Sequence, residues 1–459
     1  MPTPILKPAA ALRSAGLLLS IFLLCTSTVF TQSTPEPERE MLLNGLRILY
    51  LRQPGNPNVV LRLRIHSGAA FDLANKGGMM ALLSDAMFPD PSTRDYVTDE
   101  LGGRLEVTTT HDAIDVTISG NASGLERMID LLRGAVLTTQ LDADSVTTLR
   151  NARVKLLSAK AVTAADVADH AITNRLFGTF PYAHPASGTA ESVAKVERAD
   201  LMLARERFLN ADNATLAVIG GVEKPRLMRA LRQLLGPWEK SDKTIPSTFR
   251  QPNPPDARAL ALAVPGGGNS EVRIAVRGLA RQDTDALAAD LLAMIVRERL
   301  KAAIPQLTSL AVKHESHLLP GMFLISLSTP NEVATKALAA AQEVTRALSQ
   351  SGPTPTEVES ARSLLTAETG RQFSQPETVA AAWLDVETFK SPRPSVVSTL
   401  IRSLSPADVQ RVATRLFKDT AAATVVVATY NPAFGDKPAP QGAASPDAKP
   451  DPAAPIKKP

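Results

Sequence analysis

The feature that most constrains the fold of this chain is an internal repeat. The segment Ala199–Ile219 is echoed by Pro406–Val427, and each copy pairs a predicted helix with an apolar strand. The separation of about 208 residues is the length of a domain, not of a solenoid repeat. Chance similarity between two Ala-rich stretches is the alternative. A length of 459 residues also exceeds one ordinary core, so we predict two similar α+β units.

Composition sets the predicted segment boundaries. We predict an N-terminal domain over residues 34–249, a linker over 250–256 and a C-terminal domain over 257–432. The linker is placed there because the prolines between Pro252 and Pro255 cannot continue a helix or a central strand. Residues 433–459 are dominated by Pro, Ala, Lys and Asp, so we predict a disordered tail.

Local patterns in the first unit predict particular elements. A turn and strand over Leu42–Leu51 and an alternating strand over Val59–Ile65 suggest a hairpin. Helices are expected over Met79–Phe88 and Leu125–Leu137, with strand character over Leu105–Ile118. The run Gly266-Gly267-Gly268 lacks the residues of a phosphate loop and predicts a turn between strands.

The N-terminus has the pattern of a secretory signal. Lys7 and Arg13 precede an uncharged, apolar stretch, so we predict a signal peptide within residues 1–33 and an exported, periplasmic or extracellular protein. An uncleaved membrane anchor and lipidation of Cys25 remain alternatives. Cys25 is the only cysteine, so the mature chain is expected to have no disulfide.

Charge and aromatic content argue against nucleic-acid binding. The formal charge is +4, and basic residues are scattered among acids instead of forming a stripe. Only 4% of the residues are aromatic, which leaves few platforms for stacking bases.

Several short segments, taken in order, resemble the M16 family of peptidases (pitrilysin and mitochondrial processing peptidase). They cover about residues 41 to 432, most closely in the first unit. The resembling segments are Leu43–Arg47, Gly78–Phe88, Leu101–Gly103, Phe177–Thr189, Asn210–Thr215, Gly321–Phe323 and the stretch that begins at Leu404. The resemblance implies two homologous α+β domains, each a largely antiparallel sheet packed with helices.

The resemblance also implies where catalytic groups should lie. Active members carry H-x-x-E-H on a helix, with two His ligands to zinc, a Glu general base and a further Glu ligand on a later helix. The matching positions here hold Ala81, Ser84 and Asp85, and the later ligand falls at Leu156. Alanine has no donor atom and serine is a poor proton acceptor, so we expect no zinc site and no other cofactor.

The remaining histidines offer little to rebuild a metal site. His314 and His317 form the only close pair among six, the others being His66, His111, His170 and His184, and on a strand their spacing places them on opposite faces. Active members also hold the substrate carbonyl with an Arg and a Tyr from the second domain. Arg297 or Arg299 is the substrate-binding candidate, although Thr308 stands near the Tyr position and a solvated helix face is the alternative.

These features favour a pseudopeptidase over an enzyme. The leading hypothesis is a non-catalytic subunit that forms a heterodimer with an M16 chain carrying an intact zinc motif and helps to enclose and bind a peptide substrate. The alternatives are a stand-alone peptide-binding or scaffold protein of the cell envelope, and an active zinc peptidase with a relocated metal site.

Overall fold

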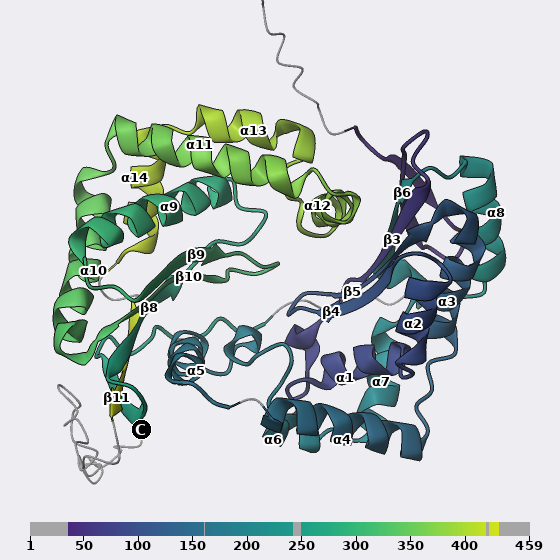
Figure 1. Ribbon diagram of the computed structural model, residues 1–459, viewed down its shortest axis with the longest axis horizontal. Coiled ribbons are helices and arrows are strands. Elements are labelled where there is room, and N and C mark those ends of the chain that lie inside the picture. Colours follow the sequence, from purple (N-terminus) through teal and green to yellow (C-terminus); the bar gives the residue numbers. More distant parts are fainter. Residues whose placement is uncertain (1–34, 160, 242–248, 419–421, 431–459) are drawn as a thin grey trace, which may run out of the picture. The chain divides into compact units, whose positions relative to one another are not determined.

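The computed structural model describes residues 35–159, 161–241, 249–418 and 422–430. The predicted signal segment with Cys25 and the predicted tail lie outside the described residues. The described residues group into one compact unit. Within it, the described strands form two separate sheets (Figure 1).

The first sheet has the spatial order β1-β2-β6-β3-β5-β4. Its strands are β1 Glu38–Met41, β2 Arg47–Arg52, β3 Asn58–Ile65, β4 Arg104–Thr109, β5 Ile114–Asn121 and β6 Ala214–Gly220. β2 and β6 run parallel, and the other neighbouring pairs are antiparallel. Because β6 lies between β2 and β3, the predicted hairpin of these two strands is wrong. Their shared partner comes from a part of the chain about 150 residues later, which no local pattern reveals.

The second sheet repeats this arrangement without a counterpart of β1. Its order is β7-β11-β8-β10-β9, with β7 and β11 parallel and the other pairs antiparallel. Its strands are β7 Leu260–Pro265, β8 Asn269–Arg277, β9 Ser309–Glu315, β10 Met322–Pro330 and β11 Ala423–Tyr430. The predicted turn at Gly266–Gly268 joins β7 to β8. The predicted α+β class, with two largely antiparallel sheets packed against helices, is confirmed.

Helices cover both sheets. Where the apolar periodicity of the sequence was strong, the predicted helix bounds agree closely with the observed ones. The predicted helix Leu125–Leu137 has the same bounds in the structure. The helices and short 3-10 turns (η) of the first half are η1 Ala69–Phe71, α1 Met79–Met87, α2 Ser92–Asp99, η2 Ala122–Gly124, α3 Leu125–Leu137, α4 Ala143–Ala159, α5 Ala164–Phe177, η3 Pro181–Ala183, α6 Ala190–Ala194, α7 Arg198–Phe208, η4 Ala211–Asn213 and α8 Lys224–Leu234. Those of the second half are α9 Ala286–Ala303, η5 Asn331–Val333, α10 Ala334–Ser351, α11 Pro355–Gln372, α12 Pro376–Phe389, α13 Pro394–Ser403 and α14 Pro406–Leu416.

The repeat seen in the sequence is the pair α7–β6 and its counterpart α14–β11. Asp200 and Asp408 occupy the same place, the third residue of a helix that begins with a capping box. In the sequence the two strands align at their shared Ala-Thr pairs, Ala214-Thr215 with Ala423-Thr424, and this alignment is wrong by one residue. Leu216 of β6 packs with its own helices, whereas Val425 of β11 packs against α5 on the other face. Side chains alternate along a strand, so a shift of one residue brings equivalent positions onto the same face. The spacing of 208 residues that relates α7 to α14 then also relates β6 to β11, and it pairs Ala214 with Ala422.

Each half places one helix on the sheet of the other half. Ile172 of α5 is buried with Val425 and other residues of the second sheet. Trp383 of α12 is buried with Leu49 and Ile219 of the first sheet. This exchange covers the face of each sheet that its own helices leave open, and it links the two halves through apolar burial.

Residues 249–259, which include the predicted linker, have neither helix nor strand. The guanidinium of Arg277 donates to the carbonyls of Pro252 and Asn253 at 2.5 and 2.6 Å, so this segment is held against the second sheet. The domain boundaries themselves stay a prediction.

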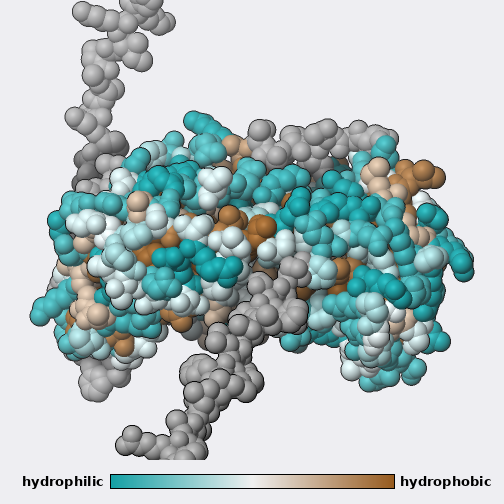
Figure 2. All heavy atoms as spheres, turned by 90° about the horizontal axis from the view of Figure 1, so that it is seen from above, coloured by the Kyte–Doolittle hydropathy of each residue, from teal (hydrophilic) through white to brown (hydrophobic). Residues whose placement is uncertain are grey.

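Hydrophilic side chains predominate on the face seen in Figure 2, where hydrophobic side chains show in small separate groups. In the described part of the chain, no helix combines the length and the apolar character needed to cross a bilayer.

Candidate functional site

The helix that carries the expected zinc-motif positions is fixed tightly at its N-terminus. α1 begins after Gly78, whose φ of 89° suits glycine, and a Cβ there would meet the carbonyl oxygen of Ser187 at 2.7 Å. The Asp72 carboxylate accepts hydrogen bonds from the backbone N–H groups of Gly78 and Met80 at 2.6 and 2.8 Å. Burial raises the pKa of Asp72 to about 7, although these two hydrogen bonds and the charge of Arg153 act in the opposite direction.

The residues of α1 lie on two faces with different contacts. The stripe of Met79, Leu82, Leu83 and Ala86 belongs to the first hydrophobic core. Ala81 and Ser84 are also buried, at 1% and 5% exposed, so the second face is covered as well. The Ser84 hydroxyl donates to the carbonyl of Ala81 at 2.7 Å and accepts from Thr109 of β4 at 2.8 Å. This hydroxyl therefore joins α1 to the edge strand of the sheet.

The third motif position, Asp85, forms an ion pair with a residue of α4. Its carboxylate accepts from the Arg153 guanidinium at 2.6 Å. Arg153 also donates to the carbonyl of Ser187 at 3.2 and 3.1 Å, in the loop that packs against Gly78. Arg153 thus ties together α4, α1 and the loop before α6.

The residues at these positions do not fit a zinc ion. Zinc needs several nitrogen, sulfur or carboxylate donors, and the methyl group of Ala81 offers none. The carboxylate of Asp85 faces a guanidinium, which keeps its positive charge at every physiological pH and donates hydrogen bonds only. A cationic side chain therefore lies beside Asp85, the one acid at these three positions.

Leu156, the predicted counterpart of the later Glu ligand, lies on α4 one turn beyond Arg153. Its side chain is 70% exposed. Arg153 is the residue of α4 that reaches α1. The sequence prediction considered only acids and histidines as ligands in this stretch, so it did not identify Arg153. The signal in the sequence was a basic residue on the helix that was expected to face Asp85.

The two predicted substrate-binding arginines lie on α9 and face different surroundings. Arg299 donates to both carboxylate oxygens of Glu357 on α11, at 2.7 and 2.9 Å. Arg297 lines a cavity of about 640 Å³ between α9, β9 and α11. No described residue of α1 lines that cavity. The carbonyl-binding role of either arginine stays a prediction, and Arg297 is the more accessible of the two.

Four of the six histidines line one cavity of about 290 Å³ where the two halves meet: His111, His170, His184 and His317. The centre of this cluster is a hydrogen-bonded group of polar side chains. The buried Asp112 carboxylate accepts from the Tyr182 hydroxyl at 2.8 Å and lies 3.3 Å from the ring of His317. Burial raises the pKa of Asp112, but the hydrogen bond and charge of His317 and the hydrogen bond of Tyr182 outweigh it, so the pKa lies below its usual value.

His314 and His317 do not lie on one strand, so the prediction that a shared strand places them on opposite faces is wrong. His314 is on β9 and contacts Asp290 at 2.9 Å, whereas His317 lies beyond the end of that strand. The ring of His111, whose pKa burial lowers to about 4, contacts the carbonyl of His184 at 2.8 Å. Across the part of the chain that the structure describes, no group of three or more His, Cys, Asp or Glu side chains is arranged to hold a metal ion.

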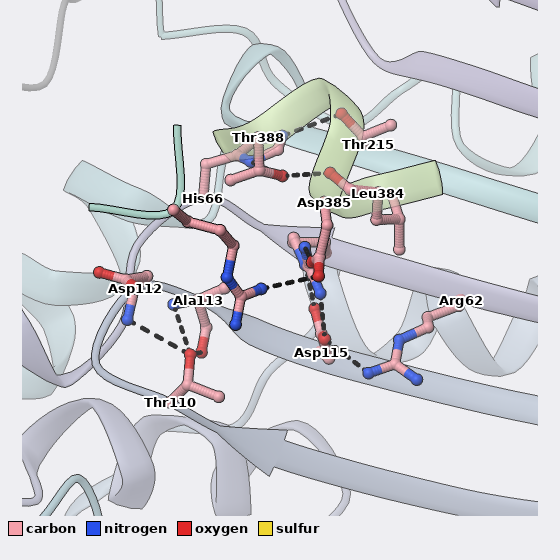
Figure 3. A network of polar contacts seen from close by, with 12 residues as sticks. Arg62, His66, Thr110, Asp112, Ala113, Asp115, Thr215, Leu384, Asp385 and Thr388 are labelled. Carbon is pink, nitrogen blue, oxygen red and sulfur yellow. Dashed lines mark hydrogen bonds and ion pairs between the residues drawn. The ribbon is translucent and has the colours of Figure 1, made fainter. Parts of the chain in front are cut away.

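A second polar network fixes α12 on the first sheet (Figure 3). Arg64 donates to both oxygens of Asp115 at 2.7 and 2.8 Å and to Asp385 of α12 at 2.6 Å. Arg281, from the second half, donates to the other oxygen of Asp385 at 2.7 Å. Burial lowers the pKa of Arg64, but the two carboxylates raise it above its usual value, so the guanidinium stays charged.

Together these features define a class: a two-sheet α+β chain with an ion pair at positions where the sequence resemblance implies zinc ligands in active relatives. A family model described as the peptidase M16 inactive domain matches residues 195–365. The human mitochondrial cytochrome b-c1 complex subunit 1 is 25% identical over 247 residues, which cover 52% of this chain and 51% of that protein. An uncharacterized zinc protease of Mycobacterium tuberculosis is 24% identical over 205 residues, covering 44% and 47% respectively.

The chain spans about half the length of these curated relatives in the matched regions. The crystal structure of a peptidase M16 inactive domain from Pseudomonas fluorescens has the same fold, with a TM-score of 0.77, 18% identity, and coverage of 86% of this chain and 98% of that one. The chain is thus similar to M16 peptidase family proteins in part of its sequence, and it shares their fold.

Proposed function

We propose that this chain is a non-catalytic M16 subunit that pairs with a zinc-bearing M16 peptidase and helps to enclose and bind its peptide substrate. The observation that carries this proposal is the Asp85–Arg153 ion pair. It occupies the helix face on which an active member binds zinc, with Ala81 and Ser84 at the neighbouring motif positions. A general base and a metal-bound water are both required for hydrolysis by such a site, and these residues supply neither.

The relatives are consistent with this role. One is a subunit of a larger complex by name, and another is a zinc protease by name. A chain that keeps two complete sheets and a tightly fixed α1 retains its shape without the metal ligands. Shape and binding surface are therefore the contributions that the proposal assigns to it. The signal-like sequence of residues 1–33 supports an exported protein, so the partner is expected in the periplasm or outside the cell.

The test is reconstitution with the M16 chains of the same organism that carry an intact H-x-x-E-H motif. Each chain is purified alone, and equimolar mixtures at micromolar concentration are passed over a size-exclusion column. An obligate pair should bury roughly 2,000 Å² or more and elute as a stable heterodimer. Cleavage of unfolded peptides should rise over that of the partner alone, and a partner whose motif Glu is changed to Gln should be inactive in the same mixture.

Failure of every mixture to form a complex or to change activity would contradict the subunit role. The outcome would then favour a stand-alone peptide-binding protein of the cell envelope. Cleavage by this chain alone, abolished by a chelator and restored by zinc, would favour an active peptidase with a relocated metal site.

A further inference from the structure

The helix layer of the first sheet contains a helix that follows the central strand. After β6 the chain forms α8, whose Leu227 and Leu231 are fully buried in the first core. They share this core with Ile129 and Val136 of α3, which are 0% and 2% exposed. α8 therefore seals the flank of α3 and the sheet beneath it.

The second sheet has an open cavity in the corresponding place. α10 is the counterpart of α3, because each follows a 3-10 turn after the same strand of its sheet. Beside α10 lies a cavity of about 530 Å³. Its apolar lining comes from β8, β10 and the residue after α14: Ile274, Val276, Phe323, Ile325 and Phe417. Polar and charged residues also line it: Gln342, Glu343, Thr345 and Arg346 of α10, and Lys418. Among the described residues, which end at Tyr430 after β11, none forms a helix there.

The flank of α10 is less buried than the flank of α3. Leu338 and Thr345, the counterparts of Ile129 and Val136, are only partly buried. Gln342, the counterpart of the partly buried Arg133, is exposed. A cavity that combines apolar strand side chains with polar and charged side chains of a helix flank is a surface that can receive an amphipathic helix.

The sequence that follows Tyr430 does not repeat the pattern of α8. At the spacing of 208 residues, α8 corresponds to residues 432–442, which contain three prolines and two glycines. Phe434 is the only large apolar residue among them, whereas α8 supplies Leu227, Met228 and Leu231. Proline within a helix removes a hydrogen-bond donor and clashes with the preceding turn, so this sequence is a poor substitute for α8.

We propose that this cavity is the docking groove for an amphipathic helix of a partner protein, seated along α10 as α8 is seated along α3. The partner helix presents Leu or Met side chains on consecutive turns, because these fill the place that Leu227 and Leu231 fill in the first half. The groove lies in the helix layer of the second sheet, away from the α1 positions, so this interaction does not depend on the fate of the zinc motif.

The test uses a synthetic peptide of residues 223–239, which contains α8 and Trp238, as the probe. In the full chain, Gln342 is replaced by the photocrosslinking amino acid p-benzoylphenylalanine. The matched control carries the same amino acid at Arg133, where α8 already covers the groove. We expect saturable crosslinking of the peptide at position 342, half-maximal at roughly 10–100 µM. Little is expected at position 133.

A peptide with Leu227 and Leu231 changed to Asp should lose at least about tenfold in affinity, because two apolar anchors are lost. Absence of peptide crosslinking at position 342, or equal crosslinking at both positions, would overturn the proposal. Mass spectrometry identifies the crosslinked residues. Crosslinks from position 342 to residues 431–459 of the same chain would assign the groove to this chain's own tail and would also overturn it.

Discussion

The ion pair at the motif positions predicts a measurable energetic coupling between α1 and α4. We consider the single variants Asp85→Asn and Arg153→Met and their combination. Two unit charges about 4 Å apart attract by roughly 4 kcal/mol near a protein surface, before desolvation and side-chain ordering are subtracted. The side chains are 38% and 14% exposed, so solvent screening reduces the net coupling to about 1 kcal/mol. Arg153→Met also loses the hydrogen bonds to Ser187, so its total cost is expected to be about 2 kcal/mol.

The assay is urea unfolding followed by far-ultraviolet circular dichroism, with the coupling taken from the double-mutant cycle. The coupling should decrease in about 1 M NaCl, because salt screens a partly exposed pair. Leu156→Ala is the matched control, because Leu156 lies on the same helix as Arg153 and is exposed to solvent. We expect it to change the free energy of unfolding by no more than about 0.5 kcal/mol. A coupling below about 0.3 kcal/mol would refute the view that this pair replaces the metal as the link between the helices.

Three further predictions concern other sites. Burial lowers the pKa of His111 to about 4, so the neutral ring contributes at most about 3 kcal/mol of stability, fully present above about pH 6.5 and lost as the pH falls toward 4. Unfolding measured from pH 8 to 4 tests this prediction. A His111→Gln variant whose stability keeps the same dependence on pH would argue against it. Asp385→Asn should lower the free energy of urea unfolding by roughly 3 kcal/mol, because the buried Arg64 loses a partner. Glu387→Gln, in an exposed pair with Arg39, should lower it by less than about 1 kcal/mol. Equal losses in the two variants would contradict the role of the buried network. Restoring the ligand and base positions should create a site that binds about one zinc per chain in calorimetry, and failure to bind would show that the motif positions are misplaced. The changes in this variant are Ala81→His, Ser84→Glu, Asp85→His and Arg153→Glu. The last change is made at Arg153, which contacts Asp85, and not at the predicted ligand position Leu156, which is exposed.

The sequence predicted the elements whose signals are local. The periodicity of α3 and α1 gave their bounds to within one residue, and the repeat predicted two similar α+β units, each of which contains one sheet. The predicted strand correspondence was wrong by one residue because the two segments begin with the same Ala-Thr pair. Only the burial of Leu216 and Val425 on opposite faces reveals the true alignment.

Other features depend on contacts between distant parts of the chain and carry no local signal. The insertion of β6 between β2 and β3 requires a strand about 150 residues away. The exchange of α5 and α12 between the sheets requires knowledge of which faces remain open. Arg153 was missed because the expected ligand was an acid, whereas the folded chain balances the remaining Asp85 with a cation.

Zinc content and peptide cleavage, measured on one preparation of the purified chain, decide between a non-catalytic subunit and an active peptidase. The metal is determined by mass spectrometry after gel filtration, and cleavage is followed with a library of unfolded peptides. We predict less than about 0.1 zinc per chain and no cleavage above that of a buffer control, because Ala81, Ser84 and Asp85 cannot hold the ion or activate water. About one zinc per chain, together with cleavage that a chelator abolishes and added zinc restores, would contradict the non-catalytic assignment.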